Sequence, residues 1–120
     1  NYVSPDFFCR FLTAMMSSPE FETYIHTLPS PGSNGTLAAN MKSSPVEMKA
    51  RIKVKSGSMN GVRCYSGYIL PADYASGNAA REDILSRTIV FSIMTNNCTS
   101  PTWKVRPLLD KIMVTLASGN

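Results

Sequence analysis

Four consecutive residues, Lys55-Ser56-Gly57-Ser58, bring together a cation, two hydroxyls and a glycine at the end of a strand-like pattern. Serine hydroxyls can donate hydrogen bonds to a carboxylate, and the lysine ammonium adds the positive charge that strengthens such bonds. Gly57 would let another backbone approach closely because it has no side chain. If this strand lies at a sheet edge, a peptide ligand could pair with it as a further strand. The run predicts a site for a peptide carboxylate, although so short a string also occurs in ordinary linkers.

The charge distribution is compatible with an anionic ligand. The chain has 12 Lys and Arg against 8 Asp and Glu, and the excess lies between residues 42 and 63. Glu47 is the single acid in that stretch, and the cations are Lys42, Lys49, Arg51, Lys53, Lys55 and Arg63. An anionic partner and a solvated charged strand explain the pattern equally well. Nucleic acid is disfavoured, because no aromatic residues for base stacking are interleaved with these cations.

The cysteines define no further site. Cys9, Cys64 and Cys98 are an odd number and form no C-x-x-C pair. The sequence therefore supports neither a zinc site nor a complete disulfide framework, and at most one bridge could form.

Two amphipathic helices are expected before the Lys-Ser-Gly-Ser run. Residues 4–16 carry apolar side chains at three- and four-residue intervals, with Ser4 as the N-cap. A shorter helix is expected to begin at Ser18, with Pro19 in its first position, and Pro29 ends it.

Three strands are expected to form the sheet that positions the run. Polar and apolar residues alternate over 51–55, and the Asn60-Gly61 dipeptide is typical of a tight hairpin that leads into a second strand at 62–70. Residues 88–94 are almost continuously apolar, which predicts a strand buried on both faces in the middle of a sheet.

The rest of the chain completes an α+β pattern. Residues 71–86 form a longer connection with a helical turn near 81–85, and residues 105–116 predict a final helix across the sheet, anchored by Trp103. We expect an antiparallel three-stranded sheet with flanking helices. Residues 1–120 would be a single, partial domain. No stretch approaches the roughly 20 apolar residues of a membrane span, and the first residues lack a signal-peptide pattern.

Longer segments around the Lys-Ser-Gly run carry a family resemblance. They are residues 28–37, 54–63, 66–69 and 91–97, which follow one another with matching gaps. The chain resembles, from about Val3 to Leu116, the carboxyl-terminal part of the DacB-like penicillin-binding proteins, the S13 peptidase family of serine D-Ala-D-Ala carboxypeptidases and endopeptidases. The resemblance implies the carboxyl-terminal part of the penicillin-binding and β-lactamase-like transpeptidase fold.

In that family three motifs build the active site: Ser-x-x-Lys with the nucleophile, Ser-x-Asn, and Lys-Thr-Gly or Lys-Ser-Gly on an edge strand. Lys55, Ser56 and Gly57 match the third. The resemblance implies that Lys55 and Ser56 hold the terminal carboxylate of the substrate, and that the backbone NH of Ser58 forms half of the oxyanion hole. Asn1 would be a remnant of the second motif.

The first motif is missing, because no lysine has a serine three positions before it. We therefore expect the substrate-binding portion of a serine-type D-Ala-D-Ala carboxypeptidase or endopeptidase, unable to attack its substrate alone. The resemblance implies no metal or cofactor, a periplasmic or envelope location, and peptidoglycan stem peptides and β-lactams as ligands of the parent protein. The alternative is a non-catalytic module of the same fold that binds peptidoglycan or a protein.

The resemblance also has a consequence for the third strand. In the family's fold, the strand matching residues 88–94 is central, and strands from upstream sequence pair with its second side. We expect that side to be an unprotected edge here, because the strand has neither the charges nor the prolines that discourage association. Pairing with a second copy of the chain would cover it.

Overall fold

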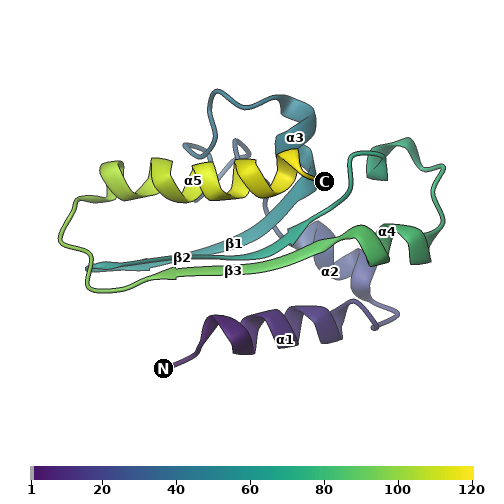
Figure 1. The fold of residues 1–120 in the computed structure, drawn as a ribbon, viewed down its shortest axis with the longest axis horizontal. Coiled ribbons are helices and arrows are strands. Elements are labelled where there is room, and N and C mark those ends of the chain that lie inside the picture. The colour runs from purple at the N-terminus through teal and green to yellow at the C-terminus, as the bar shows by residue number, and fades with distance from the viewer. Residues whose placement is uncertain (1) are drawn as a thin grey trace.

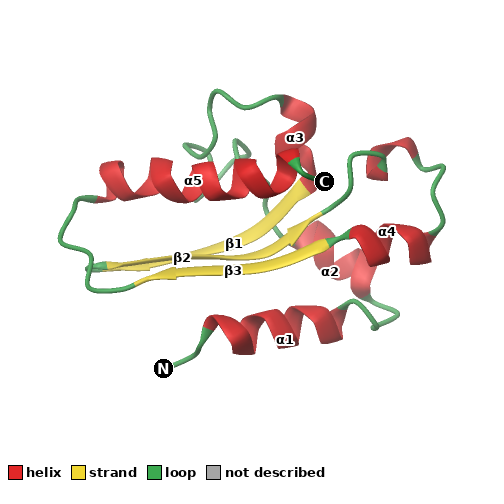
Figure 2. Cartoon of the chain, viewed as in Figure 1, coloured by secondary structure: helices red, strands yellow, loops and turns green. Residues whose placement is uncertain are grey.

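The computed structural model describes residues 2–120, so the proposed role of Asn1 lies outside the described residues. The elements form an α+β arrangement, as expected (Figure 2). In chain order they are α1 (Pro5–Met15), α2 (Phe21–Thr27), α3 (Val46–Arg51), β1 (Ile52–Met59), β2 (Val62–Ile69), the 3-10 turn η1 (Tyr74–Ser76), α4 (Arg81–Arg87), β3 (Ile89–Thr95) and α5 (Thr102–Ser118).

The first helix begins as its sequence predicts. The side chain of Ser4 accepts a hydrogen bond from the Phe7 NH at 3.1 Å, and proline occupies the first turn. The second helix begins later than predicted, at Phe21 instead of Ser18. The hydroxyl of Ser18 bonds to the Glu20 NH at 3.1 Å and holds the intervening residues in a turn.

The sheet has the order β1-β2-β3, with both pairs antiparallel. The hairpin between β1 and β2 turns at Asn60-Gly61, where Gly61 has a φ of 72° that glycine adopts without strain. A second glycine is required by close packing between the strands. A Cβ on Gly67 would lie 2.0 Å from the carbonyl oxygen of Lys53, so no larger residue fits there.

The third strand confirms the expectation of an unpaired second side, whereas the central place in the sheet that its apolar composition suggested is not seen. β2 lies in the middle of the sheet and β3 lies at its edge, and of the β3 side chains only Phe91 is fully buried. The apolar composition indicated burial on both faces, but the three strands supply no neighbour for the second side of β3.

Helices cover both faces of the sheet (Figure 1). On one face α5 packs over a core that contains Ile52, Val54, Tyr65, Phe91 and Met113. On the other, α1 and α2 pack over a smaller core built from Leu12, Phe21, Ile25, Tyr68 and Leu70. The final helix therefore lies across the sheet as predicted. Trp103 does not anchor it, since its side chain is 69% exposed.

Residues 46–51 form a short helix that the sequence pattern did not indicate. The alternation over 51–55 placed Arg51 on the polar face of a strand, whereas Arg51 is the last residue of α3. Its guanidinium donates hydrogen bonds to the carbonyl oxygens of Leu70 and Ala117, at 2.8 and 3.0 Å. Arg51 therefore joins β2 to the end of α5, and this cation has a structural role.

All three cysteines are free in the structure. Among residues 2–120, no helix is both long enough and apolar enough to cross a membrane.

Candidate functional site

The Lys-Ser-Gly-Ser run lies within β1 and on the open edge of the sheet. The direction of its backbone groups follows from two hydrogen bonds. The Arg51 carbonyl accepts from the Leu70 NH towards β2, whereas the Val54 NH points away from β2 and donates to the Pro29 carbonyl, both at 2.9 Å. Because the pairing of β1 with β2 runs without a bulge and antiparallel residues alternate in direction, the NH groups of Ser56 and Ser58 also point away from β2.

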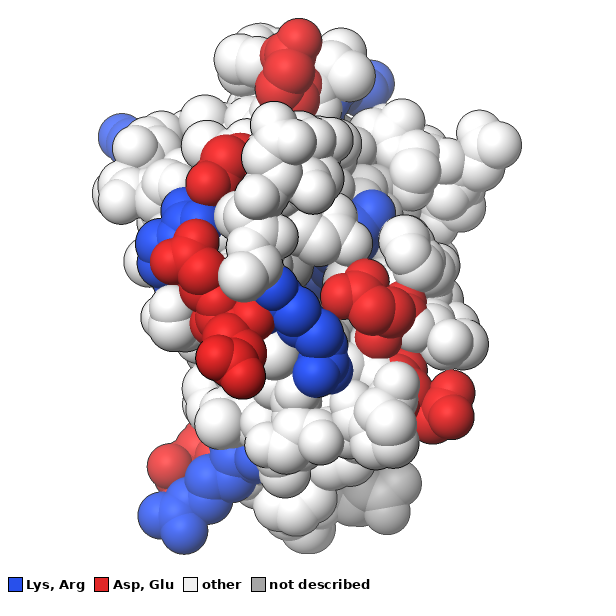
Figure 3. Space-filling model, turned by 90° about the vertical axis from the view of Figure 1, so that its right-hand side faces the viewer, with Lys and Arg blue, Asp and Glu red and all other residues white. Residues whose placement is uncertain are grey.

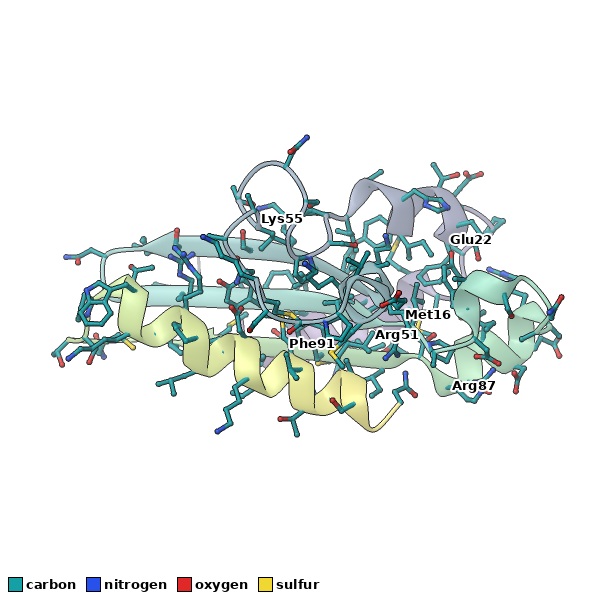
Figure 4. The ribbon with its side chains drawn as sticks, turned by 90° about the horizontal axis from the view of Figure 1, so that it is seen from above. Met16, Glu22, Arg51, Lys55, Arg87 and Phe91 are labelled. Carbon is teal, nitrogen blue, oxygen red and sulfur yellow. The ribbon has the colours of Figure 1, made fainter. Side chains whose placement is uncertain are left out.

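The ammonium of Lys55 lies beside this outer edge. Its Nζ donates to the Ser56 carbonyl oxygen at 2.6 Å, and the side chain is exposed. Figure 4 shows Lys55 at the margin of the sheet, beside the loop that joins α2 to α3. Among the described residues, no acidic side chain forms an ion pair with Lys55. Its charge is therefore free to meet an anion from solution.

Lys53, two residues earlier, lies in a drier environment. Its Nζ donates to the Ser30 hydroxyl at 3.1 Å, and burial lowers its pKa below the ordinary value for lysine. The neighbouring Pro29 carbonyl accepts the hydrogen bond from the Val54 NH. Residues 29 and 30 therefore cover this half of the β1 edge. The open part of the edge begins beyond Val54.

Ser56 is the serine of the run whose hydroxyl has a hydrogen-bond partner among residues 2–120. Its Oγ donates to the Oγ1 of Thr36, which lies in the loop that joins α2 to α3, at 3.2 Å. The hydroxyl of Ser58 makes no hydrogen bond with the described residues. Of the two serines in the run, Ser56 is thus the one whose hydroxyl is oriented by a side chain from another segment.

Gly57 has no packing reason to be glycine. A Cβ there would meet only the Cβ of Cys64, at 4.0 Å, an ordinary contact. This differs from Gly67, ten residues later, where the sheet itself excludes a side chain. The absent side chain of Gly57 keeps one wall of a groove open.

That groove has a volume of about 1040 Å³ and lies between the α1 side of the hairpin and the start of α1. Lys55, Ser56 and Gly57 contribute to one wall. The other lining residues are Tyr2, Val3, Ser4, Phe8, Met59, Val62, Cys64, Ser66, Met94, Thr95 and Asn96. Sequence reasoning did not assign Cys64 and Ser66 to the site. Cross-strand pairing with Gly57 and Lys55 is the signal that would have indicated them.

The opposite end of the molecule carries charges of a different kind. Figure 3 shows Asp and Glu mixed with Lys and Arg on the face near α4. There Arg87 pairs with Asp73 at 2.9 Å, and this hydrogen bond lowers the pKa of the Asp73 carboxyl. Neutralised charges of this kind do not attract an anion, in contrast to the unpaired Lys55.

The family model described as the D-Ala-D-Ala carboxypeptidase 3 (S13) family matches residues 1–117, and the chain belongs to this family. This confirms the resemblance on which the sequence interpretation rests. The comparison with curated proteins finds no match. Among residues 2–120, no cluster of three His, Cys, Asp or Glu side chains could hold a metal ion.

Proposed function

We propose that this chain forms the carboxylate-binding part of a serine-type D-Ala-D-Ala carboxypeptidase that acts on peptidoglycan stem peptides. The observation that carries the proposal is the convergence of donors on one open edge. An unpaired ammonium, a hydroxyl and two outward-pointing NH groups come from three residues, Lys55, Ser56 and Ser58. A terminal carboxylate has two oxygens with several acceptor sites and can use all of these donors.

Each residue has a distinct role in the proposal. Lys55 provides the charge that attracts the carboxylate, and Ser56 donates a directed hydrogen bond. The family resemblance assigns to the outward-pointing NH of Ser58, two residues further along β1, a hydrogen bond to the carbonyl oxygen of the peptide bond before the terminal residue, as half of an oxyanion hole. Removal of one such donor typically costs about 2.7 to 4 kcal/mol of transition-state stabilisation. Gly57 lets the ligand, or the group that attacks it, come close to the strand.

The chain binds in this proposal and does not attack. The family's acyl-enzyme reaction needs the serine of Ser-x-x-Lys, and no lysine in this sequence has a serine three positions before it. A β-lactam carries a carboxylate and would meet the same donors, but it would acylate only a serine supplied by other sequence. A periplasmic or envelope location follows from the substrate.

Titration followed by amide NMR tests the proposal directly. The ligands are diacetyl-lysyl-D-alanyl-D-alanine and the same peptide with a carboxamide in place of its terminal carboxylate. We expect weak, carboxylate-dependent binding by the wild-type chain. Lys55→Ala should weaken it about tenfold at low salt, since charge-assisted hydrogen bonds contribute roughly 1.5 kcal/mol or more.

Lys111→Ala is the matched control. Lys111 is an exposed cation on α5 that lines no part of the groove, so its removal changes net charge equally and leaves the donors in place. Equal weakening by the two substitutions would mean that the peptide responds to overall charge. Equal affinity for carboxylate and carboxamide would rule out a carboxylate site at this edge.

A further inference from the structure

We propose that Thr36 is a positioning residue for the carboxylate site, because it keeps the Ser56 hydroxyl hydrogen-bonded both with and without ligand. The inference rests on the proposed function and adds a residue that lies outside the Lys-Ser-Gly-Ser run. The contact that suggests it is the hydrogen bond between the two hydroxyls, in which Ser56 Oγ donates to Thr36 Oγ1 at 3.2 Å.

A single hydroxyl has one proton to donate and two lone pairs that accept. In the free chain the proton of Ser56 is directed to Thr36. When Ser56 turns this proton towards a carboxylate, its lone pairs become available on the Thr36 side, and the Thr36 hydroxyl can donate into them. The hydrogen bond between the two residues is then kept with its direction reversed. Donation from Thr36 also strengthens the hydrogen bond that Ser56 makes to the anion.

Thr36 can do this only if its position is fixed, and the residues after it provide that. Leu37 is fully buried in the core beneath α5, and its carbonyl accepts from the Gly32 NH at 2.9 Å. Asn40, which is 1% exposed, donates from Nδ2 to the Asp110 carboxylate at 2.6 Å and to the Tyr65 hydroxyl at 3.0 Å. The Met41 NH donates to the other oxygen of Asp110 at 3.0 Å.

The buried network fixes the loop to the same place in the sheet that carries Ser56. Tyr65 is the cross-strand partner of Ser56, and its hydroxyl receives the Asn40 hydrogen bond. Asn40 therefore holds the loop against β2 at the level of Ser56, four residues after Thr36. Thr36 itself is exposed, follows Gly35, and its hydroxyl meets that of Ser56. The buried hydrogen bonds of Asn40 and Met41 thus fix the loop that presents the Thr36 hydroxyl to Ser56.

Thr36→Val and Thr36→Ser separate this role from general stability. Valine has nearly the same shape without the hydroxyl, and serine keeps the hydroxyl. Because a typical net hydrogen bond contributes roughly 0.5 to 1.5 kcal/mol, Thr36→Val should weaken binding of diacetyl-lysyl-D-alanyl-D-alanine about three- to tenfold. Thr36→Ser should bind as the wild type does. Neither variant should change the affinity for the carboxamide peptide, which lacks the anion.

Thr23→Val is the matched control, because Thr23 is an exposed threonine on α2 whose hydroxyl makes no hydrogen bond within residues 2–120. Its binding should equal that of the wild type. Wild-type affinity in Thr36→Val, or an equal loss for Thr36→Val and Thr36→Ser, would overturn the role of Thr36 while leaving the proposed function standing. A wild-type chain that shows no carboxylate-dependent binding would overturn both.

Discussion

The two edges of the sheet differ in whether their outward-pointing backbone groups have hydrogen-bond partners. On β1 the outward groups are partly used, since the Val54 NH bonds to the Pro29 carbonyl and the Ser56 carbonyl receives the Lys55 ammonium. On β3 the outward groups are those of Val90, Ser92 and Met94, and none has a backbone partner among residues 2–120. Lysines interrupt β1, whereas β3 contains no charged residue and no proline.

The difference shows which partner each edge can accept. Charges and a covering loop discourage a second sheet from pairing with β1, and they leave a short opening at Ser56 and Ser58 suited to a chain end. The β3 edge favours another strand, because its backbone groups are free and its side chains are apolar. We therefore propose a ligand site on one edge and an association edge on the other.

The largest expected effect concerns reactivity, because the proposed ligand site lies in a sequence without a Ser-x-x-Lys motif. Incubation of this chain with a fluorescent penicillin should give no covalent adduct, and a D-Ala-D-Ala peptide should remain uncleaved. Intact mass spectrometry checks the first and chromatography the second. A stoichiometric acyl adduct on the chain would contradict the separation of binding from attack.

The next effect separates a glycine that the fold requires from one that it does not. In Gly67→Ala the new Cβ would meet the Lys53 carbonyl oxygen at 2.0 Å and the Val54 Cα at 2.8 Å. Both atoms are backbone and cannot give way without moving β1 off β2. We expect a loss of roughly 3 kcal/mol or more in the free energy of unfolding. Urea unfolding followed by circular dichroism measures it.

Gly57→Ala is its control on the neighbouring strand, where the nearest atom is 4.0 Å from the new Cβ. It should lower the free energy of unfolding by less than about 1 kcal/mol. A similar loss for both variants would show that Gly57 also serves packing, and would weaken the argument that its open wall belongs to a ligand groove.

The third prediction concerns the β3 edge. We expect the chain to associate through this edge at micromolar concentration. Ser92→Pro removes an outward-pointing NH and should give a folded monomer, at the cost of the hydroxyl contact with Ser66. Ile93→Pro removes an NH that faces β2 and should destabilise the fold. Analytical ultracentrifugation, with circular dichroism as the folding check, distinguishes the two variants.

A wild-type chain that sediments as a monomer, with slow amide exchange at Val90 and Ser92, would show that the β3 edge is already protected. The proposal of an association edge would then be wrong. Association that persists unchanged in Ser92→Pro would place the contact elsewhere, for example on the exposed Phe7 and Phe11 of α1.

The smallest expected effect is that of salt, and it should act on one edge only. Raising the ionic strength from about 0.1 M to about 1 M shortens the Debye length from roughly 10 Å to 3 Å. Binding of the carboxylate peptide should weaken several-fold, because Lys55 is exposed. Association through the apolar β3 edge should not weaken. If salt weakened both peptide binding and association, the proposed electrostatic difference between the two edges would be wrong.

The sequence predicted the helices and strands themselves better than it predicted which neighbours they pack against. Ser4 and Pro5 identified the first helix, and Asn60-Gly61 identified the hairpin, because these signals act locally. The apolar composition of β3 suggested a central strand, whereas the family's strand order predicted an edge here, because burial of a strand depends on neighbours that its own composition does not specify. Arg51 was assigned to a strand, since the charge alternation continues across the last residue of α3.

The proposed site is contiguous in one part and dispersed in another. Lys55 to Ser58 stand together in the sequence, so their types suggested a carboxylate site, and the family resemblance of the longer segments around them made that prediction specific. Thr36 is 20 residues from Ser56, and the Asn40 network that fixes it joins residues up to 70 positions apart. Such contacts depend on how the loop folds against β2 and α5, which no local pattern reveals.

A residue-by-residue map of amide shifts during titration with diacetyl-lysyl-D-alanyl-D-alanine shows which edge of the sheet binds the peptide. Two pairs of outward NH groups are compared, Ser56 and Ser58 on β1 with Val90 and Ser92 on β3. We expect saturable shifts at Ser56 and Ser58 that disappear with the carboxamide peptide, and none at Val90 and Ser92. Shifts at the β3 pair, or an unresponsive β1 pair in a folded chain, would contradict this expectation.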